Sequence, residues 1–177
     1  MNNIFLVGLR GSGKTTVGKL LAHHLYRPFI DTDQMIAERQ GCSIAEVFHT
    51  RGEASFRHME TATLQEVVFF HGGAVVSTGG GIILRAGNRE LMRREGLVFH
   101  LSAPPEILYQ RIAKDADSDS LRPSLNGLTG LEDMRATWHK RELLYEAARH
   151  FEIPVENRLP QEVMEAIVAH LPKAIAD

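Results

Sequence analysis

The chain has 177 residues, of which 44% are hydrophobic and 24% charged, and its formal net charge is −2. These values are typical of one soluble α/β domain, and they exclude the strongly basic surface that nucleic acids or anionic membranes would require. The single cysteine, Cys42, rules out an intrachain disulfide and favours a reducing compartment. No run of residues reaches the ~20 apolar positions of a membrane span, so we expect a cytoplasmic protein.

Short apolar runs alternate along the chain with longer stretches of helical periodicity. This alternation predicts a parallel sheet covered by helices, with residues 1–177 forming one domain. The expected strands are residues 4–7, 29–30, 74–77, 97–101 and 151–153. The expected helices are residues 14–25, one from Ser43 with a Ser43–Glu46 capping box, 53–70, one from Pro104, 131–150 and one from Pro160. The pair Phe69-Phe70 is expected in the core.

The first expected strand runs into a glycine-rich segment, residues 8–15, that matches the pattern G-x-x-x-x-G-K-[ST] in full. Successive backbone N–H groups must converge on phosphates without Cβ atoms in the way, which Gly8, Gly11 and Gly13 permit. The following helix directs its free N–H groups and positive dipole end at the same phosphates. Lys14 would reach the β- and γ-phosphate oxygens, and the Thr15 hydroxyl would bind Mg²⁺. Because the motif follows a strand and opens a helix, we interpret it as a nucleotide site rather than a chance turn.

Two carboxylates, Asp31 and Asp33, follow the second expected strand at the edge where ligands gather in a parallel sheet. Alternate residues there point in different directions, so one carboxylate can serve Mg²⁺ while the other faces a substrate hydroxyl. The alternative interpretation is a helix N-cap, a role that Asp33 in particular could fill.

Arginines and glycines further along the chain indicate what receives the phosphate. Arg57 and Glu60 are three positions apart on an expected helix, where the alternative is a surface ion pair of small value. Residues 79–81 are three consecutive glycines, which cost backbone entropy unless a ligand or another backbone approaches closely. Arg122 and Arg141 suit a carboxylate or a transferring phosphoryl group, although each could equally form a salt bridge.

Taken together, these motifs resemble the shikimate kinase family over nearly the whole chain. The matching segments are residues 8–15, 31–33, 52–60, 78–81, 121–123 and 141–145, in the family's order and approximate spacing. The resemblance implies a three-layer P-loop kinase fold of the α/β class, with a five-stranded parallel sheet (order 2-3-1-4-5) flanked by helices and a mobile lid. It also implies transfer of the ATP γ-phosphoryl group to the 3-hydroxyl of shikimate, in the pathway to chorismate and aromatic amino acids.

The resemblance further implies a nucleotide site and a metal site. ATP would be bound by Gly11, Ser12, Gly13, Lys14, Thr15, Thr16, Arg111, Arg122 and Arg158. Within that set, Arg111 and Arg158 would sandwich the adenine. Mg²⁺ would be held by Thr15 and, through water, by Asp31.

For the acceptor, the resemblance implies a set of shikimate contacts: Asp33, Arg57, Gly79, Gly80, Gly81 and Arg141. Arg57 and Arg141 would hold the carboxylate, and Asp33 the hydroxyls. The residues with catalytic roles would be Lys14, Asp33 and Arg122.

Two subregions are expected within the domain. Residues 33–61 would form the substrate-binding subregion, and residues 114–126 a lid that carries Arg122 onto the phosphates. Asp115, Asp117 and Asp119 make the start of that lid acidic, and we interpret them as a solvated outer face.

Two alternative functions remain open. The first is a P-loop kinase for another small metabolite, such as gluconate or a nucleoside monophosphate, although Arg57 with Arg141 favours a carboxylated acceptor. The second is a non-catalytic relative that only binds, although Lys14, Asp31, Asp33 and Arg122 form a complete catalytic set. The expected partners are ATP or ADP and shikimate, without nucleic acid or membrane, and we expect a monomer.

Overall fold

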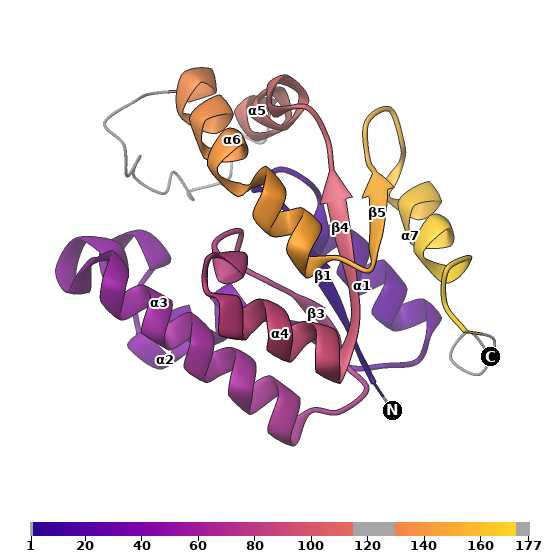
Figure 1. Cartoon of the computed structure of the whole chain (residues 1–177), viewed down its shortest axis with the longest axis horizontal. Helices are drawn as coiled ribbons and strands as arrows, with labels where there is room; N and C mark the ends of the chain where they lie inside the picture. The colour runs from indigo at the N-terminus through magenta and orange to yellow at the C-terminus, as the bar shows by residue number, and fades with distance from the viewer. Residues whose placement is uncertain (1, 115–129, 173–177) are drawn as a thin grey trace.

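The computed structural model describes residues 2–114 and 130–172 (Figure 1). Its centre is a five-stranded parallel sheet with the strand order β2-β3-β1-β4-β5, which confirms the expected order 2-3-1-4-5. The strands are β1 (Asn3–Val7), β2 (Phe29–Asp31), β3 (Val75–Ser77), β4 (Gly96–Ser102) and β5 (Phe151–Pro154). The helices are α1 (Lys14–His24), α2 (Thr32–Gln40), α3 (Ile44–Phe70), α4 (Ala86–Glu95), α5 (Pro105–Lys114), α6 (Gly130–Ala148) and α7 (Pro160–Val168), with a 3₁₀ turn η1 (Ile82–Leu84).

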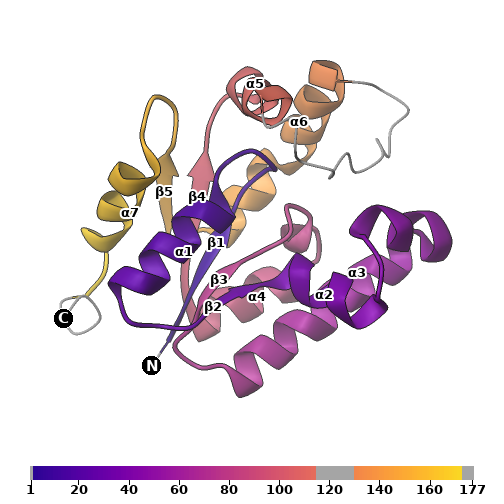
Figure 2. The same cartoon turned by 180° about the vertical axis from the view of Figure 1, so that it is seen from behind.

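Helices cover both faces of the sheet, which confirms the three-layer architecture. In Figure 1, α4 and α6 lie in front of the sheet with α3 alongside, and the view from behind in Figure 2 shows α1 and α7 on the opposite face. Strands β1 and β3 are buried along their whole length. A parallel sheet covered on both faces requires such continuous apolar strands, since neither face reaches water. Among the described helices, none is long and apolar enough to cross a membrane.

The register of the sheet places the polar residues that follow its strands. Asp31 of β2 is opposite Ser77 of β3, and Ser77 is also paired with Leu6 of β1. On the other side of β1, Val7 is paired with His100 of β4. The carboxyl ends of four strands therefore meet around Gly8, at the edge where parallel sheets bind ligands.

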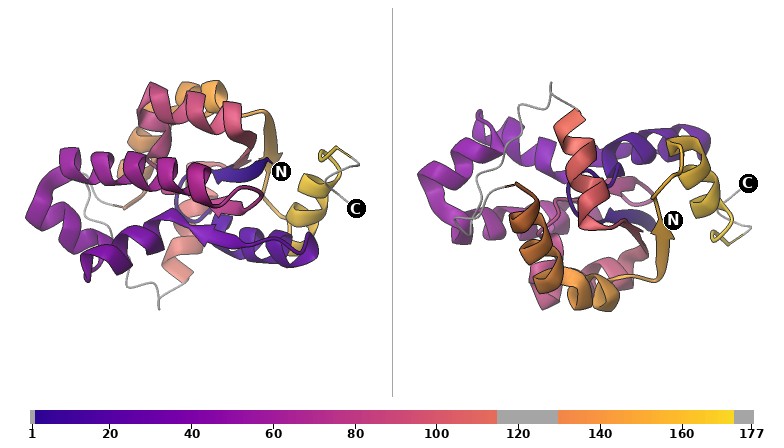
Figure 3. Two further views of the ribbon diagram at one scale, coloured as in Figure 1. Left: turned by 90° about the horizontal axis from the view of Figure 1, so that it is seen from below. Right: turned by 90° about the horizontal axis from the view of Figure 1, so that it is seen from above.

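Helix α3 is interrupted at Gly52, whose φ of 76° and ψ of 166° are not helical. The two expected helices at this point are therefore confirmed as two segments of α3. The expected capping box is also confirmed, because Ser43 Oγ accepts from Glu46 N–H and the Glu46 carboxylate accepts from Ser43 N–H. Both segments of α3 share a small hydrophobic cluster with α2, centred on Ile36, Val47 and Phe56. Figure 3 shows this part projecting beyond the sheet, on the side away from α7.

The sequence analysis did not anticipate α2 or α4, and one of its core assignments is wrong. Phe69 and Phe70, expected in the core, are 83% and 75% exposed at the end of α3. The buried face of this part of α3 carries Leu64 and Val67. Phe69 and Phe70 follow the last buried residue of the helix. The expected lid, with Arg122 and the three aspartates before it, lies outside the described residues apart from Lys114.

Candidate active site

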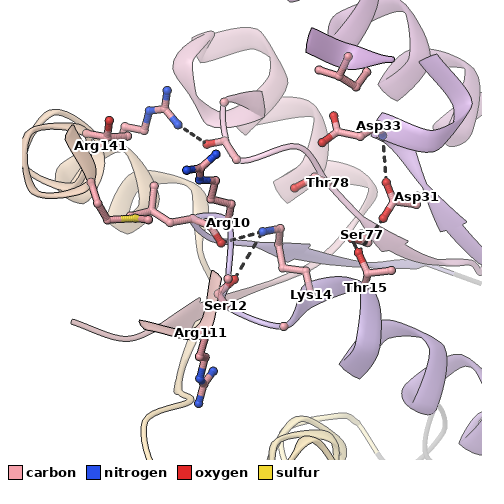
Figure 4. Close-up of a pocket in the computed structure, with 18 of the residues that line it drawn as sticks. Arg10, Ser12, Lys14, Thr15, Asp31, Asp33, Ser77, Thr78, Arg111 and Arg141 are labelled. Carbon is pink, nitrogen blue, oxygen red and sulfur yellow. Dashed lines mark hydrogen bonds between the residues drawn. The ribbon is translucent and has the colours of Figure 1, made fainter. Parts of the chain in front are cut away.

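A single cavity of about 1170 Å³ opens at the carboxyl ends of β1, β2 and β3 (Figure 4). Its volume exceeds that of a typical pocket for one drug-sized ligand. The expected site residues in its lining are Gly11, Ser12, Gly13, Lys14, Thr15, Thr16, Asp31, Asp33, Arg57, Gly80, Gly81, Arg111, Arg141 and Arg158. Of the other two, Gly79 is not part of the lining, and Arg122 is outside the described residues. We call residues 8–16 with Asp31 and Ser77 the phosphate end, and Asp33, Arg57, residues 79–81 and Arg141 the acceptor end.

The phosphate loop between β1 and α1 requires its glycines for both conformation and space. Gly11 and Gly13 have φ angles of 80° and 84°, in the left-handed region that favours glycine. A Cβ atom on Gly8 would lie 2.6 Å from the Leu101 carbonyl oxygen, and one on Gly11 would lie 2.8 Å from that of Leu108. The backbone can therefore curve closely against β4 and α5 and still begin α1 at Lys14.

Lys14 is folded over the phosphate loop. Its Nζ donates to the carbonyl oxygens of Gly8 and Leu9, both at 2.9 Å, and lies 3.4 Å from Ser12 Oγ. In Figure 4, the ammonium lies between Arg141 and the group formed by Thr15, Asp31 and Ser77. A charged donor is thus held over the loop that phosphates would enter.

Three oxygen-bearing side chains lie together beside the loop. Thr15 Oγ1 donates to Asp31 Oδ2 at 2.9 Å and lies 3.4 Å from Ser77 Oγ. Asp31 Oδ1 in turn accepts from the N–H groups of Asp33 and Gln34, so Asp31 is the N-cap of α2. The alternative that Asp33 caps a helix is therefore wrong, because the helix begins at Thr32, two residues earlier than that alternative requires. Ser77 was missed by the sequence analysis, although its position at the end of a buried strand was a usable signal.

These oxygens fit a hard divalent cation such as Mg²⁺, which prefers one or two carboxylates together with phosphates and water. Within residues 2–114 and 130–172, no group of three His, Cys, Asp or Glu side chains could hold a metal ion alone. The described site therefore suits a cation that arrives with a nucleotide.

Arg57 is held between two carboxylates on the second segment of α3. Its Nη1 donates to Glu60 Oε2 at 2.6 Å, and its Nη2 and Nε donate to Glu53 Oε1 at 3.0 and 3.3 Å. The guanidinium also lies 5.4 Å from the centre of the Phe56 ring. Burial opposes the charge of Arg57, but the two carboxylates outweigh it and raise the pKa of Arg57 above its ordinary value. The alternative of a surface ion pair with Glu60 is wrong, because Glu60 is 0% exposed.

The glycine triplet gives room to the side chains of the acceptor end. A Cβ atom on Gly81 would lie 2.1 Å from Arg57 Nη1. One on Gly79 would lie 2.6 Å from Asp33 Oδ1 and 2.7 Å from Glu60 Oε1. At these two positions a neighbouring side chain, rather than a backbone, makes the close approach that the sequence analysis expected.

Arg141 reaches the acceptor end from α6. Its Nη1 donates to the Gly80 carbonyl oxygen at 3.2 Å, and Tyr145 Oη donates to the same oxygen at 2.8 Å. Tyr145 is fully buried, and that burial raises the pKa of its phenol to about 12. Tyr145 falls within the matching segment 141–145, but no role for it was expected from the sequence.

At the opposite end of the cavity, Arg111 of α5 and Arg158 of the β5–α7 loop line the wall. Arg111 Nη2 donates to the Val155 carbonyl oxygen at 2.7 Å. Figure 4 shows Arg111 on the far side of the phosphate loop from Asp33. The two arginines are thus brought to one cavity wall, as the expected adenine contact requires, while the contact itself stays a prediction.

Known proteins resemble this chain along most of its length. The family described as shikimate kinase matches residues 10–172. "Shikimate kinase 2" of Photorhabdus laumondii is 46% identical over 85% of this chain and 86% of its own length. "Shikimate kinase" of Symbiobacterium thermophilum is 42% identical over 96% and 95% of the two chains.

A solved structure agrees with this match in sequence. The shikimate kinase of Acinetobacter baumannii, in complex with shikimate, superposes with a TM-score of 0.86 at 35% identity, over 95% of this chain and 91% of its own. With a phosphate loop, a candidate acceptor end and the predicted fold in place, this chain belongs to the shikimate kinase family of ATP-dependent kinases.

Proposed function

We propose that this protein transfers the γ-phosphoryl group of ATP to the 3-hydroxyl of shikimate, giving shikimate 3-phosphate and ADP. The observation that carries the proposal is that one cavity combines a phosphate loop with Asp33, Arg57 and Arg141. A phosphate loop serves many kinases, but two arginines facing the same cavity suit an acceptor that carries a carboxylate. Membership of the shikimate kinase family supports the same acceptor.

In the proposed complex, Arg57 and Arg141 bind the carboxylate of shikimate. A guanidinium has five N–H donors, and the described bonds to Glu53 and Glu60 use only three of those of Arg57. The two carboxylates therefore orient the group and still leave donors on Nη1 and Nη2 for a ligand. Arg141, whose Nη1 already donates to the Gly80 carbonyl, would approach the same carboxylate from α6.

At the phosphate end, Lys14 would exchange its bonds to the loop carbonyls for bonds to the β- and γ-phosphate oxygens. Thr15 and, through water, Asp31 would hold Mg²⁺, with Ser77 close enough to orient a water ligand. Mg²⁺, when bound, would neutralise charge on the transferring group. Arg111 and Arg158 would contact the adenine at the other end of the cavity.

Within the acceptor end, Asp33 lies on the first turn of α2. There it would orient the 3-hydroxyl toward the γ-phosphate and accept its proton late in the transfer, because phosphoryl transfer depends mainly on alignment and charge. We retain Arg122 as a third charged contact to the phosphates, on a lid of residues 114–126. We also retain residues 33–61 as the substrate-binding subregion, since both Asp33 and Arg57 fall within it.

We further propose that the protein acts in the cytoplasm as a monomer. A single cysteine suits a reducing compartment, and none of the described helices is suited to a membrane. Multi-angle light scattering at micromolar concentration would test the monomer, and a mass of two chains would contradict it.

The proposed reaction is tested by a coupled ADP-release assay with Mg²⁺-ATP and three acceptors: shikimate, gluconate and a nucleoside monophosphate. We expect turnover with shikimate alone, and a product whose phosphorus couples to the proton at C3 in the NMR spectrum. Absence of shikimate-dependent ADP release would overturn the proposal. Binding of shikimate without turnover would instead favour a non-catalytic relative.

A further inference from the structure

Two buried aromatic rings and one partly buried ring pack together beneath the acceptor end. Tyr145 of α6 and His100 of β4 stack with their ring centres 4.5 Å apart and their planes 7° from parallel. Trp138, two helical turns before Tyr145, packs on the same imidazole at 6.0 Å. His100 is 1% exposed, and neither of its ring nitrogens has a hydrogen-bond partner among the described residues. The imidazole therefore serves here as a flat packing surface.

Tyr145 connects this stack to the acceptor end through a hydrogen bond to Gly80. Tyr145 Oη and Arg141 Nη1 both donate to the Gly80 carbonyl oxygen, which has two lone pairs to accept them. Tyr145 and Arg141 are four positions apart on α6 and so share one face of the helix. One oxygen thus joins a buried tyrosine to an arginine that lines the cavity.

Gly80 has little freedom to move between its neighbours. A Cβ atom on Gly80 would lie 3.3 Å from the carbonyl oxygen of Gly8 in the phosphate loop and 3.7 Å from Tyr145 Oη. His100, which backs Tyr145, is in turn paired with Val7, the residue that precedes that loop. The position of the Gly80 carbonyl is therefore determined from the buried side of the cavity, by Tyr145.

We propose that Tyr145 is a positioning residue for the acceptor: with its ring held flat by His100, its hydroxyl fixes the Gly80 carbonyl and, through that oxygen, the orientation of Arg141 toward the substrate carboxylate. This inference rests on the proposed function. Without the hydroxyl, the Gly80 carbonyl keeps only the longer bond from Arg141, so the carboxylate site loses alignment. The phosphate loop keeps all of its own contacts.

The test is Tyr145→Phe, which keeps the ring and its stacking and removes only the hydroxyl. We expect the KM for shikimate to rise about tenfold, as loss of one hydrogen bond would give, with the KM for ATP changed less than twofold. Tyr26→Phe is the matched control, because Tyr26 is 96% exposed and the same chemical change there should alter neither constant. An unchanged KM for shikimate, or equal rises in both KM values, would overturn the proposal.

A double-mutant cycle separates positioning from general stability. If Tyr145 acts through Arg141, Tyr145→Phe should have little further effect on the KM for shikimate in an Arg141→Lys background. If the two substitutions instead multiply, Tyr145 does not act through Arg141 and the proposal fails.

His100 gives a second test that does not depend on the folding of Tyr145→Phe. His100→Ala removes the ring behind Tyr145 and is expected to raise the KM for shikimate severalfold, and His100→Phe, which restores a flat ring, is expected to reverse that rise. A rise that His100→Phe does not reverse would contradict the packing role. Wild-type protein without shikimate turnover would overturn the proposed function itself, whereas active wild type with unaffected variants would overturn only the role of Tyr145.

Discussion

The phosphate end of the cavity is built mainly from consecutive residues, whereas the acceptor end is assembled from distant ones. Residues 8–16 form most of the phosphate end, and much of their contribution is backbone. The acceptor end combines side chains of α2, α3 and α6 with the glycine triplet that follows β3. Phosphate groups have the same charge and geometry in every nucleotide, so a local backbone motif is sufficient to bind them. A substrate with a carboxylate and hydroxyls requires groups that only a tertiary fold can bring together.

The difference predicts that the two ends can be damaged separately. Lys14→Met should give the largest effect, lowering kcat by about a thousandfold, since preorganised charge at a transferring phosphoryl group has that magnitude. Shikimate binding should change little, because the described hydrogen bonds of Lys14 go to the phosphate loop and not to the acceptor end. Steady-state ADP release and titration calorimetry with shikimate measure the two quantities. A kcat within tenfold of wild type would remove Lys14 from the chemistry.

Arg57→Ala should damage the acceptor end in two ways. It would abolish one of the two proposed contacts to the substrate carboxylate. It would also leave Glu60 buried without its arginine, which should lower the free energy of unfolding by about 3 kcal/mol. Adding Glu60→Gln should restore most of that stability but not the affinity for shikimate. Urea unfolding and calorimetry distinguish the two losses.

A matched control for Arg57 is available on the surface. Arg39 pairs with Glu66 where both side chains are partly exposed, so Arg39→Ala should change the unfolding free energy by no more than about 0.5 kcal/mol. If Arg57→Ala were equally mild, the buried pair would not have the structural role described here. If it abolished ATP binding as well, the two ends would not be separable.

The buried imidazole of His100 should make the free energy of unfolding depend on pH. Burial lowers the pKa of His100 from 6.5 to about 4, so the unfolded chain takes up the proton first as the pH falls. The free energy of unfolding should therefore decrease by about 1.6 kcal/mol between pH 6.5 and pH 5 on account of this residue. Because burial also lowers the pKa of His150, the measurement is the difference between wild type and His100→Phe in urea unfolding at each pH. Parallel pH profiles for the two proteins would contradict the expectation.

Gly81→Ala should give the smallest effect, confined to the acceptor end. Its Cβ atom would displace Arg57 Nη1, and we expect the KM for shikimate to rise roughly tenfold, about 1.4 kcal/mol, while the KM for ATP stays the same. Gly87→Ala, in α4 with open space around its Cβ atom, is the control and should leave both constants unchanged. Equal effects of the two substitutions would show that the triplet is not fitted to Arg57.

The sequence was informative wherever a signal was local. The phosphate loop, the capping box at Ser43 and the order of the strands could all be predicted from neighbouring residues or from the family resemblance. Helix α2 was missed because its start at Asp31 looked like a ligand site, whereas the structure shows that Asp31 is the N-cap of this helix. Phe69 and Phe70 were misplaced because apolar composition does not say where a helix leaves the sheet.

The acceptor end could be predicted only as a set of residues. Spacing on a helix pairs Arg57 with Glu60, but it does not show that Glu60 is fully buried or that Glu53 joins the pair. His100 carries no pattern at all in the sequence, since a histidine in a strand is an ordinary residue. Its place under Tyr145 depends on the pairing of β4 with β1 and on the packing of α6 across them.

The small cluster of Ile36, Val47 and Phe56 has a consequence for how the protein opens. These side chains are buried in a cluster separate from the main core, and they come from both sides of the break in α3 at Gly52. A segment with its own small core can open as a unit at a lower free energy than the whole domain. Residues 32–56, which contain this cluster, could thus be exchanged as one unit for recognition of another acceptor, while the phosphate loop and the sheet remain unchanged.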